Sequence, residues 1–352
     1  MQVIINSPSL DPTLNVSGIS AVTQFIIDNN DEVEYIHFEI GRRDNERGGI
    51  LRVLSILRSL KEWKKLLKSH PDALVLFNFA LTSLSTYRDS LYLFCARKRK
   101  TIVHLHGGNY LFAETMPRSI GHILCRLFSR DIPFLVLSDK EREHIQERFH
   151  AKQIYSLPNC IDLKEARTFV RTHECPELTL GYIGRIAEAK GMNELLKACI
   201  CLKSERVPFK LIIAGVEREE DRYIERFQKQ LGKSFEYMGI VSGELKKTFM
   251  MNTDVFMLPT YFEGLPMSLL ETMSFGCVPV ITNVGSIGTV VQDKENGLFV
   301  RVKCVEDLVH AVKLLHTDRK LFFHLSRTAQ ATIFEQFNPE QYLRKLNAIY
   351  QT

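Results

Sequence analysis

The chain alternates between short apolar segments and longer segments in which apolar residues recur with helical spacing. Apolar runs predict strands buried on both faces, and amphipathic segments predict helices that cover a sheet. Their alternation is typical of βαβ units, so the predicted fold class is α/β with parallel sheets. The predicted strands are Met1–Asn6, Val33–Glu39, Ala73–Asn78, Thr101–His106, Phe134–Ser138, Ile154–Leu157, Leu178–Ile183, Phe209–Ala214, Phe235–Met238, Asp254–Pro259 and Val278–Thr282. The predicted helices are Ile19–Asp28, Ile50–Ser69, Ser83–Arg97, Asp139–Phe149, Lys190–Lys203, Glu217–Leu231, Glu244–Asn252 and Gln341–Tyr350, and the segment Val305–Gln336 is predicted to be largely helical.

The segment Tyr261–Gly276 connects two predicted strands through a turn and the start of an apolar helix. Gly264 permits backbone angles that let the chain approach a ligand closely. Pro266 suits a first helical position, because its fixed φ fits the helix and its missing N–H would have no partner there. The backbone N–H groups at the helix start would point outwards with the positive end of the helix dipole, which predicts an anion site. The residues of this predicted site are Leu265, Met267 and Ser268.

Two carboxylates flank the predicted anion site, since Glu263 precedes the helix and Glu271 lies about one turn inside it. A carboxylate accepts two O–H donors at once, so a vicinal diol is a natural partner. A phosphate at the helix start with a diol on either side describes a nucleotide sugar. The alternative is a solvated turn with two surface acids, and the spacing alone leaves both interpretations open.

Arg185 and Lys190 occur on one loop, between the predicted strand Leu178–Ile183 and the helix that follows it. Arginine offers a flat fork of donors and lysine a point charge, a combination that suits a diphosphate. Both residues can equally be surface charges.

Two segments of the N-terminal half could also meet a ligand. His106 ends a predicted strand and is followed by two glycines, so its side chain would project at the sheet edge where ligands bind. It can also be an ordinary core residue, the interpretation that we give to His104. The loop that ends at Gly18 joins a strand to a helix and could cradle phosphate, or it could be an ordinary loop.

Composition limits the functional classes. A chain of 352 residues is long enough for two domains, and 45% hydrophobic and 25% charged residues are typical of a soluble globular protein. The formal charge of +5 suits an anionic ligand or membrane surface and is too small to indicate nucleic acid binding. We see no signal peptide, no apolar run that could span a membrane, and no C-x-x-C pair among the eight cysteines. These features predict a cytoplasmic protein with reduced thiols and no metal site.

The predicted helix Ile50–Ser69 has an apolar stripe and a basic surface. One interpretation is a core-facing stripe with a solvated basic face. The other is a peripheral membrane contact through the basic 42–68 region, for a lipid-linked acceptor at the inner face of the membrane. The stripe comprises Ile50, Val53, Leu54, Leu57 and Leu60, and the basic surface comprises Arg52, Arg58, Lys61, Lys64, Lys65 and Lys68, with Trp63 among them.

The spacing Glu263-x7-Glu271, in the setting FEGLPMSLLETMSFGCVPVITNVGS, resembles the signature of the retaining glycosyltransferases of family four. The resemblance covers most of the C-terminal half and, more loosely, the N-terminal half. It implies the GT-B fold: two Rossmann-like domains whose parallel sheets face a central cleft, with a last helix that crosses back to the first domain. Pro158–Asp162 resembles the family's interdomain sequence, with Cys160 at the usual glycine position. The implied parts are an acceptor-binding domain at 1–163, a nucleotide-sugar-binding domain at 164–337 and the crossing helix at 338–352.

The resemblance also implies roles for single residues of the C-terminal half. Glu263 would contact the donor sugar, Glu271 would bind the ribose diol, and the turn between them would cradle phosphate. Arg185 and Lys190 match the family's arginine-x4-lysine-glycine spacing and would meet the diphosphate. The region of Gly239 would lie against the nucleotide base.

In the N-terminal half, His106 resembles the family histidine that hydrogen-bonds the donor sugar. The loop at Gly18 would approach donor and acceptor, although Ser17 replaces one of the family's paired glycines.

The resemblance implies transfer of a glycosyl unit, with retention of configuration and no protein nucleophile, from a nucleotide sugar to an acceptor hydroxyl. The sequence contains no D-x-D motif, so we expect no metal or cofactor, with Arg185, Lys190 and the helix start meeting the charge of the leaving diphosphate. The expected setting is assembly of a cell-surface polysaccharide or glycolipid, on a saccharide or lipid-linked acceptor. The alternatives are a sugar-nucleotide epimerase of the same architecture, with only His106 well placed for acid/base work, and a non-catalytic nucleotide-sugar-binding subunit.

Overall fold

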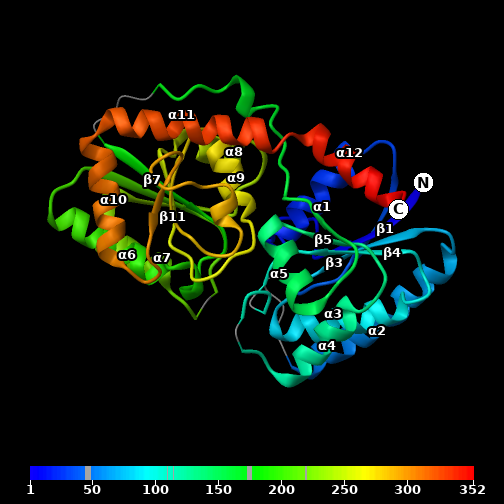
Figure 1. Cartoon of the computed structure of the whole chain (residues 1–352). Helices are drawn as coiled ribbons and strands as arrows, with labels where there is room; N and C mark the ends of the chain where they lie inside the picture. Colours follow the sequence, from blue (N-terminus) through cyan, green and yellow to red (C-terminus); the bar gives the residue numbers. More distant parts are fainter. Residues whose placement is uncertain (44–48, 109, 114, 173–176, 219) are drawn as a thin grey trace. The chain divides into compact units, whose positions relative to one another are not determined.

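The computed structural model describes residues 1–43, 49–108, 110–113, 115–172, 177–218 and 220–352, and leaves the side chains of residues 50, 51 and 83 undescribed. Residue contacts divide the chain into two compact units, which we describe separately (Figure 1). Unit 1 consists of Met1–Asn159 and Glu340–Thr352, and unit 2 of Cys160–Pro339. The sequence places these two boundaries after residues 163 and 337.

Unit 1 is built on a parallel six-stranded sheet with the strand order β2-β1-β3-β4-β5-β6. Helices α1 and α12 lie on one side of this sheet, and α2, α3 and α4 on the other (Figure 1). The strands are β1 (Gln2–Ser7), β2 (Glu34–Glu39), β3 (Leu74–Phe79), β4 (Thr101–Leu105), β5 (Phe134–Val136) and β6 (Ile154–Ser156). The helices are α1 (Gly18–Asn29), α2 (Ile50–Ser69), α3 (Ser83–Cys95), α4 (Arg118–Phe128), α5 (Asp139–Phe149) and α12 (Pro339–Tyr350).

Unit 2 is built on a second parallel six-stranded sheet, with the order β12-β11-β10-β7-β8-β9. The order reverses between β7 and β10, and in open α/β sheets this switch point is where ligands bind, outside the carboxyl ends of the strands. The strands are β7 (Leu178–Ile183), β8 (Phe209–Ala214), β9 (Phe235–Gly239), β10 (Val255–Leu258), β11 (Val278–Thr282) and β12 (Leu298–Val300). The helices are α6 (Met192–Ser204), α7 (Tyr223–Leu231), α8 (Gly243–Asn252), α9 (Met267–Ser274), α10 (Val305–Thr317) and α11 (Arg319–Gln336), with single 3-10 turns such as η1 (Ala166–Thr168) and η2 (Glu188–Lys190).

The predicted α/β fold class is confirmed, and every predicted strand has a counterpart within a few residues. The segment around Tyr261–Gly276 is the predicted βαβ unit, because β10 and β11 pair in parallel on either side of α9. The C-terminal helix α12 belongs to unit 1. Its Tyr342 ring packs edge-on against Phe25 of α1, and the Tyr350 hydroxyl lies 3.1 Å from that of Tyr35 on β2.

The helices differ from the sequence predictions at three places. The sequence reasoning missed α4, although its buried residues Ile120, Leu124 and Leu127 recur with helical spacing. The segment Val305–Gln336 is largely helical, as predicted, but it consists of two helices, because the side chain of Asp318 accepts the N–H of Leu321 and starts α11.

The third correction concerns the predicted helix Glu217–Leu231. Here α7 begins only at Tyr223, where the N–H groups of Tyr223 and Ile224 donate to the carboxylate of Glu217. Glu217 therefore serves as an acceptor for the helix start instead of being part of the helix.

The core-facing interpretation of the stripe on α2 holds for Leu60, which packs against the core of unit 1, and is wrong for the three residues that form the exposed stripe, Val53, Leu54 and Leu57. Val53, Leu54 and Leu57 are 57%, 57% and 52% exposed, whereas Trp63 of the predicted basic surface is fully buried. The buried side of α2 instead consists of Ile56, Leu60, Trp63, Leu66 and Leu67, which pack in the core of unit 1. The helix therefore has two apolar sides. Residues 44–48 of the basic 42–68 region lie outside the described residues.

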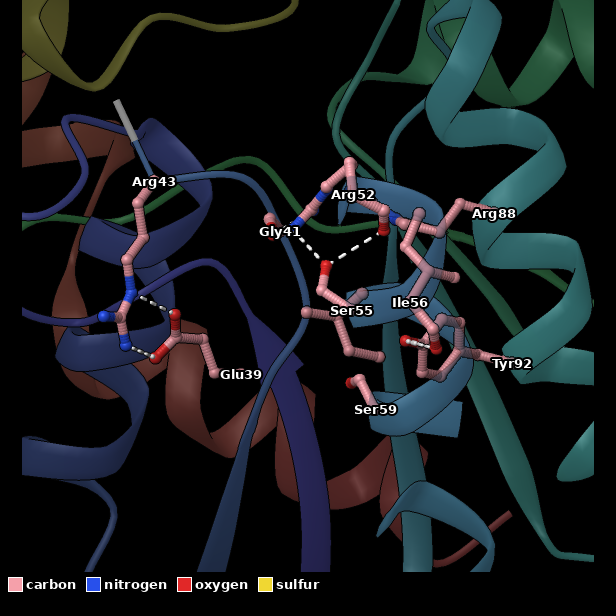
Figure 2. Close-up of a pocket in the computed structure, with 10 residues that line it drawn as sticks. Glu39, Gly41, Arg43, Arg52, Ser55, Ile56, Ser59, Arg88 and Tyr92 are labelled. Atoms are coloured by element: carbon pink, nitrogen blue, oxygen red, sulfur yellow. Dashed lines mark hydrogen bonds and ion pairs between the residues drawn. The ribbon is translucent and has the colours of Figure 1, made fainter. Parts of the chain in front are cut away.

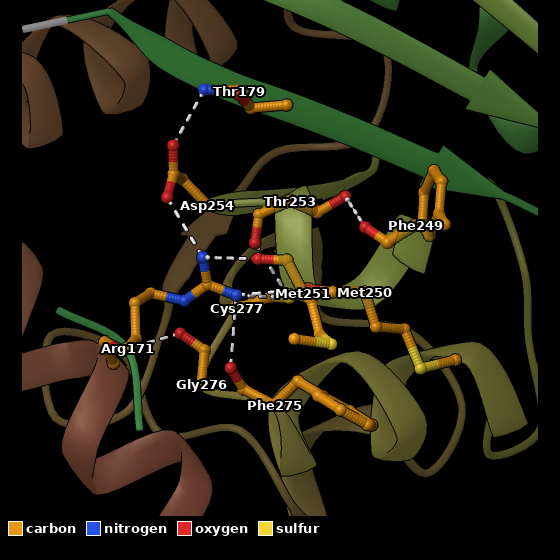
Figure 3. Close-up of polar contacts among 11 residues, drawn as sticks. Arg171, Thr179, Phe249, Met250, Met251, Thr253, Asp254, Phe275, Gly276 and Cys277 are labelled. Atoms are coloured by element: carbon orange, nitrogen blue, oxygen red, sulfur yellow. Dashed lines mark hydrogen bonds and ion pairs between the residues drawn. The ribbon is translucent and has the colours of Figure 1, made fainter. Parts of the chain in front are cut away.

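Arg171 ties the segment that enters unit 2 to the interior of that unit. Its side chain is only 4% exposed and pairs with Asp254, just before β10, at 3.1 Å (Figure 3). The same guanidinium donates to the carbonyls of Met250 and Phe275, at 3.1 Å each. The second carboxylate oxygen of Asp254 accepts the N–H of Thr179 on β7 at 2.9 Å. One arginine thus joins the entering segment, α8, α9 and two strands.

Candidate active site

The loop after β7 carries Arg185 and Lys190, at the switch point of the unit 2 sheet. Arg185 is exposed, and its carbonyl accepts the Tyr182 hydroxyl at 2.5 Å. The backbone is tight here: a Cβ on Gly215 would lie 1.8 Å from the Gly184 carbonyl oxygen, and the φ of Gly215 is +138°. Glycine therefore lets the loops after β7 and β8 approach each other.

Gly191 brings the end of this loop against the carboxyl end of β10. Its φ is +77°, and an added Cβ would lie 2.1 Å from the carbonyl oxygen of Pro259. At this junction the N–H of Tyr261 donates to the Ala189 carbonyl at 2.9 Å. The two switch-point loops therefore form one backbone-linked structure.

The most direct contact between predicted site residues is an ion pair of Lys190 Nζ with Glu263 Oε1. The two side chains are 25% and 15% exposed, so both are largely shielded while remaining open to a ligand. The sequence predicts a site role for each of these two residues separately, and the structure shows that their side chains are in contact.

A second loop fixes the turn between the glutamates. The N–H of Ser286 donates to the Gly264 carbonyl at 3.0 Å. Gly285, with φ of +59°, allows this approach, because a Cβ there would lie 2.0 Å from the Glu263 carbonyl oxygen. The position of the Glu263 backbone is thus set from both sides.

The start of α9 differs from the prediction by one residue. Pro266 precedes the helix with extended backbone (φ −66°, ψ 127°), and the first helical residue is Met267. The carbonyl of Pro266 accepts the N–H of Leu269 at 3.2 Å, so the proline caps the helix. In helix geometry the N–H groups of the first residues, Met267 and Ser268, have no intrahelical acceptor and face outwards along the dipole.

Glu271 of α9 has a partner that the sequence reasoning missed. Lys246 of α8 places its Nζ 2.6 Å from Glu271 Oε1, and both side chains are largely buried. The spacing of these residues along the chain gives no signal, because the contact depends on how α8 and α9 pack. Each predicted glutamate of the site is therefore matched by a lysine.

Gly239 lies at the carboxyl end of β9, with φ of +69°. Its carbonyl accepts the N–H of Gly215 at 2.7 Å, and Gly215 in turn accepts the Tyr237 hydroxyl at 2.8 Å. This places Gly239 next to the loop after β8, on the same sheet edge as Arg185.

His106 directly follows β4 and belongs to a polar network at the carboxyl ends of the unit 1 strands. Its Nε2 lies 2.7 Å from Oδ1 of Asn78, whose Nδ2 donates to the Asn6 carbonyl at 2.5 Å. Because this fixes Oδ1 as the acceptor, His106 carries its proton on Nε2 and presents Nδ1 as an acceptor. Burial, and then the neighbouring His104, lower the pKa of His106 well below its usual range, so the ring is neutral. Asn109, which the sequence places beyond the two glycines, lies outside the described residues.

His104 fits the core interpretation. It is fully buried, its ring lies 4.1 Å from that of His106, and burial lowers its pKa to about 3. Within the described residues neither of its ring nitrogens has a hydrogen-bond partner. Gly18 begins α1 and is exposed, and the preceding Ser17 is extended. His106 connects to α1 through Asn78, whose Nδ2 lies 3.1 Å from Thr23 Oγ1.

Comparison with known proteins shows which family this chain resembles. Residues 165–332 match the family model described as glycosyl transferases group 1. The chain is 25% identical over 280 residues to an uncharacterized glycosyltransferase of Haemophilus influenzae, over 77% of this chain and 74% of the relative. It is 28% identical over 181 residues to a putative colanic acid biosynthesis glycosyltransferase, WcaL, of Salmonella typhimurium, over 48% of this chain and 44% of the relative. The chain thus spans less than half the length of several curated relatives, WcaL among them.

Among solved structures, Anabaena HepE in complex with UDP and glucose superposes with a TM-score of 0.75 at 16% identity, covering 100% of this chain and 99% of that one. This likeness shows the fold, and supports the predicted GT-B class.

Proposed function

We propose that this chain is a group 1 glycosyl transferase with the GT-B fold. It would transfer a sugar from a nucleoside diphosphate sugar to an acceptor hydroxyl. The observation that carries the proposal is the Lys190–Glu263 pair at the switch point, beside the start of α9. Both alternatives, an epimerase and a non-catalytic subunit, are less favoured, because the matched family and both relatives are glycosyltransferases. The name of WcaL suggests polysaccharide assembly as the setting.

The site residues would act through charge. As the sugar–phosphate bond breaks, negative charge grows on the diphosphate, where Lys190, Arg185 and the N–H groups at the start of α9 would meet it. A charge-assisted hydrogen bond contributes about 1.5–3 kcal/mol, so three such groups would supply several kcal/mol. Glu263, held by Lys190, would contact the hexosyl unit, and Glu271, held by Lys246, would bind the ribose diol. We propose that this reaction needs no metal or cofactor.

The stereochemistry belongs to the same proposal. With Glu263 paired to a lysine and placed for sugar hydroxyls, we assign no protein nucleophile, and propose that attack on the leaving-group face retains the configuration. The departing phosphate would take the proton of the acceptor hydroxyl. Neutral His106, with Nδ1 as an acceptor, would suit a hydroxyl of the donor sugar.

The nucleotide assignment is tested with a panel of UDP-, GDP- and ADP-sugars in a thermal-shift assay. We expect one nucleotide class to raise the melting temperature, and the shift to persist in EDTA. Arg185→Ala should remove that shift, because the diphosphate loses a bidentate donor. Arg327→Ala on α11, which removes an exposed arginine elsewhere in unit 2, should leave it unchanged. A full shift in Arg185→Ala would contradict the phosphate role.

We also propose that unit 1 contacts an anionic membrane surface. Besides the exposed stripe of α2, the neighbouring helix α3 exposes Leu84, Tyr87, Leu91 and Phe94, at helical spacing. The same helix α2 exposes Lys61, Lys64, Lys65 and Lys68, and a combination of exposed apolar and basic residues is typical of helices that bind anionic lipids. Within the described chain no helix has both the length and the apolar character to cross a bilayer.

Vesicle co-sedimentation tests the membrane contact. We expect binding to vesicles with anionic phosphatidylglycerol and weak binding to neutral ones. Leu57→Gln with Leu91→Gln should reduce the partition coefficient at least about tenfold, since burying each leucine contributes about 1.5–3 kcal/mol. Leu245→Gln, an equally exposed leucine on α8 of unit 2, is the matched control. Equal losses in both variants would contradict the proposed face.

A further inference from the structure

Unit 1 contains a cavity of about 400 Å³, at the end of β2 and along the inner sides of α2 and α3 (Figure 2). This volume is within the range of small-molecule sites. None of its lining residues was assigned a role in donor binding. The polar side chains that line it include Glu39, Arg43, Arg52, Ser55, Ser59 and Arg88.

Among the described residues, three guanidinium groups line this cavity against one carboxylate, and each makes hydrogen bonds that hold it in place. Arg43 makes two hydrogen bonds to Glu39, at 3.0 and 3.3 Å, and Arg52 donates to the Gly41 carbonyl. Arg88 forms a second ion pair at the cavity wall, with Asp89 at 2.7 Å. Such anchoring lowers the cost of ordering a long side chain when a ligand binds.

Asp89 explains why Arg88 is so firmly placed. Its side chain is 1% exposed, and its second carboxylate oxygen accepts the N–H of Ala80 at 3.2 Å. Burial raises the pKa of Asp89, and the Arg88 charge opposes that rise. Even with this buried carboxylate included, the arginines outnumber the acids among the described residues of the cavity wall.

Hydroxyl groups complete the lining. Ser55 donates to the Arg52 carbonyl at 2.9 Å, and Ser59 and Tyr92 also face the cavity. Guanidinium forks bind phosphate and carboxylate oxygens in pairs. Such a lining is suited to a compact oxyanion.

We propose that the cavity binds a phosphate-type oxyanion carried by the acceptor. The identification of the ligand as the acceptor rests on the proposed transfer function, because the donor is assigned to unit 2. The position of the cavity supports this assignment. It opens on one side of α2, while Val53, Leu54 and Leu57 of the same helix are exposed on another side. A lipid anchored at the exposed stripe could therefore present a diphosphate to the cavity.

Calorimetric titration tests this directly, on the full chain carrying Arg185→Ala and Lys190→Ala so that the proposed donor site does not contribute. The probes are inorganic phosphate, inorganic pyrophosphate and geranyl diphosphate. We expect Arg52→Gln to weaken pyrophosphate binding about tenfold or more, which is the loss of one charge-assisted hydrogen bond. Arg58→Gln is the matched control, because it removes the same charge from an exposed position of α2 outside the cavity.

The outcomes separate the sources of the oxyanion. Tighter binding of either diphosphate than of phosphate indicates a lipid diphosphate acceptor, and equal binding indicates a phosphorylated saccharide. Equal weakening by Arg52→Gln and Arg58→Gln, or no binding of any probe, would overturn the proposal. Arg43→Gln, at an exposed side chain, repeats the test if Arg52→Gln fails to fold. This titration measures neither nucleotide binding nor sugar transfer. Its result is therefore independent of the tests of the transferase proposal.

Discussion

Replacing Glu263 by alanine is expected to lower kcat for sugar transfer by about 10²–10³-fold, the usual loss on removing one preorganised electrostatic contact. The carboxylate would act twice, since we propose that it contacts the donor sugar and it also holds the Nζ of Lys190. Binding of the free nucleoside diphosphate should remain within a few fold, because Arg185 and the start of α9 are unchanged. The measurement is release of nucleoside diphosphate from the donor in the presence of acceptor, together with titration of the free nucleotide.

A double-mutant cycle shows whether the ion pair is the cause. If Lys190 and Glu263 act as one unit, Lys190→Ala and the double variant should lose nearly the same activity as Glu263→Ala. Glu225→Ala, an exposed glutamate of α7, is the control and should retain full activity. A Glu263→Ala enzyme within threefold of the parent kcat would rule out a role in transfer.

The fold, and the approach of Lys190 to Glu263, are predictable from the sequence because their signals are local. Apolar runs such as Leu178–Ile183 and Val278–Thr282 are strands with the predicted bounds. Arg185, Lys190 and Glu263 occur on the loops that follow β7 and β10, and parallel strands bring their carboxyl ends to one edge. The proximity of Lys190 to Glu263 thus follows from topology.

Contacts between helices could not be predicted in this way. Lys246 meets Glu271 only because α8 and α9 pack side by side, and neither residue has a sequence feature that marks the other. The orientation of α2 has the same origin: it has two apolar stripes, and the sequence does not say which one the sheet covers. Trp63 settles the orientation, because its indole donates to the Tyr92 carbonyl in the core at 3.1 Å.

Arg171→Met is expected to destabilise unit 2 by about 3–5 kcal/mol, the range for removing one partner of a buried ion pair. Methionine fills much of the volume, but Asp254 would keep a buried charge, and the carbonyls of Met250 and Phe275 would lose a donor (Figure 3). For a unit of this size the loss corresponds to a fall in melting temperature of roughly 10 °C. Far-UV circular dichroism would record the transition.

The location of the effect can be checked with the single tryptophan of the chain. Trp63 is buried in unit 1, so its fluorescence should report a transition that Arg171→Met leaves nearly unchanged, while circular dichroism shows an earlier one. Arg167→Met, an exposed arginine of η1 near the same segment, should change neither. Adding Asp254→Asn to Arg171→Met should restore part of the stability, because the uncompensated charge is gone. If the free energy of unfolding falls by less than about 1 kcal/mol, the contribution of a typical surface ion pair, the buried contacts of Arg171 do not stabilise unit 2 as proposed.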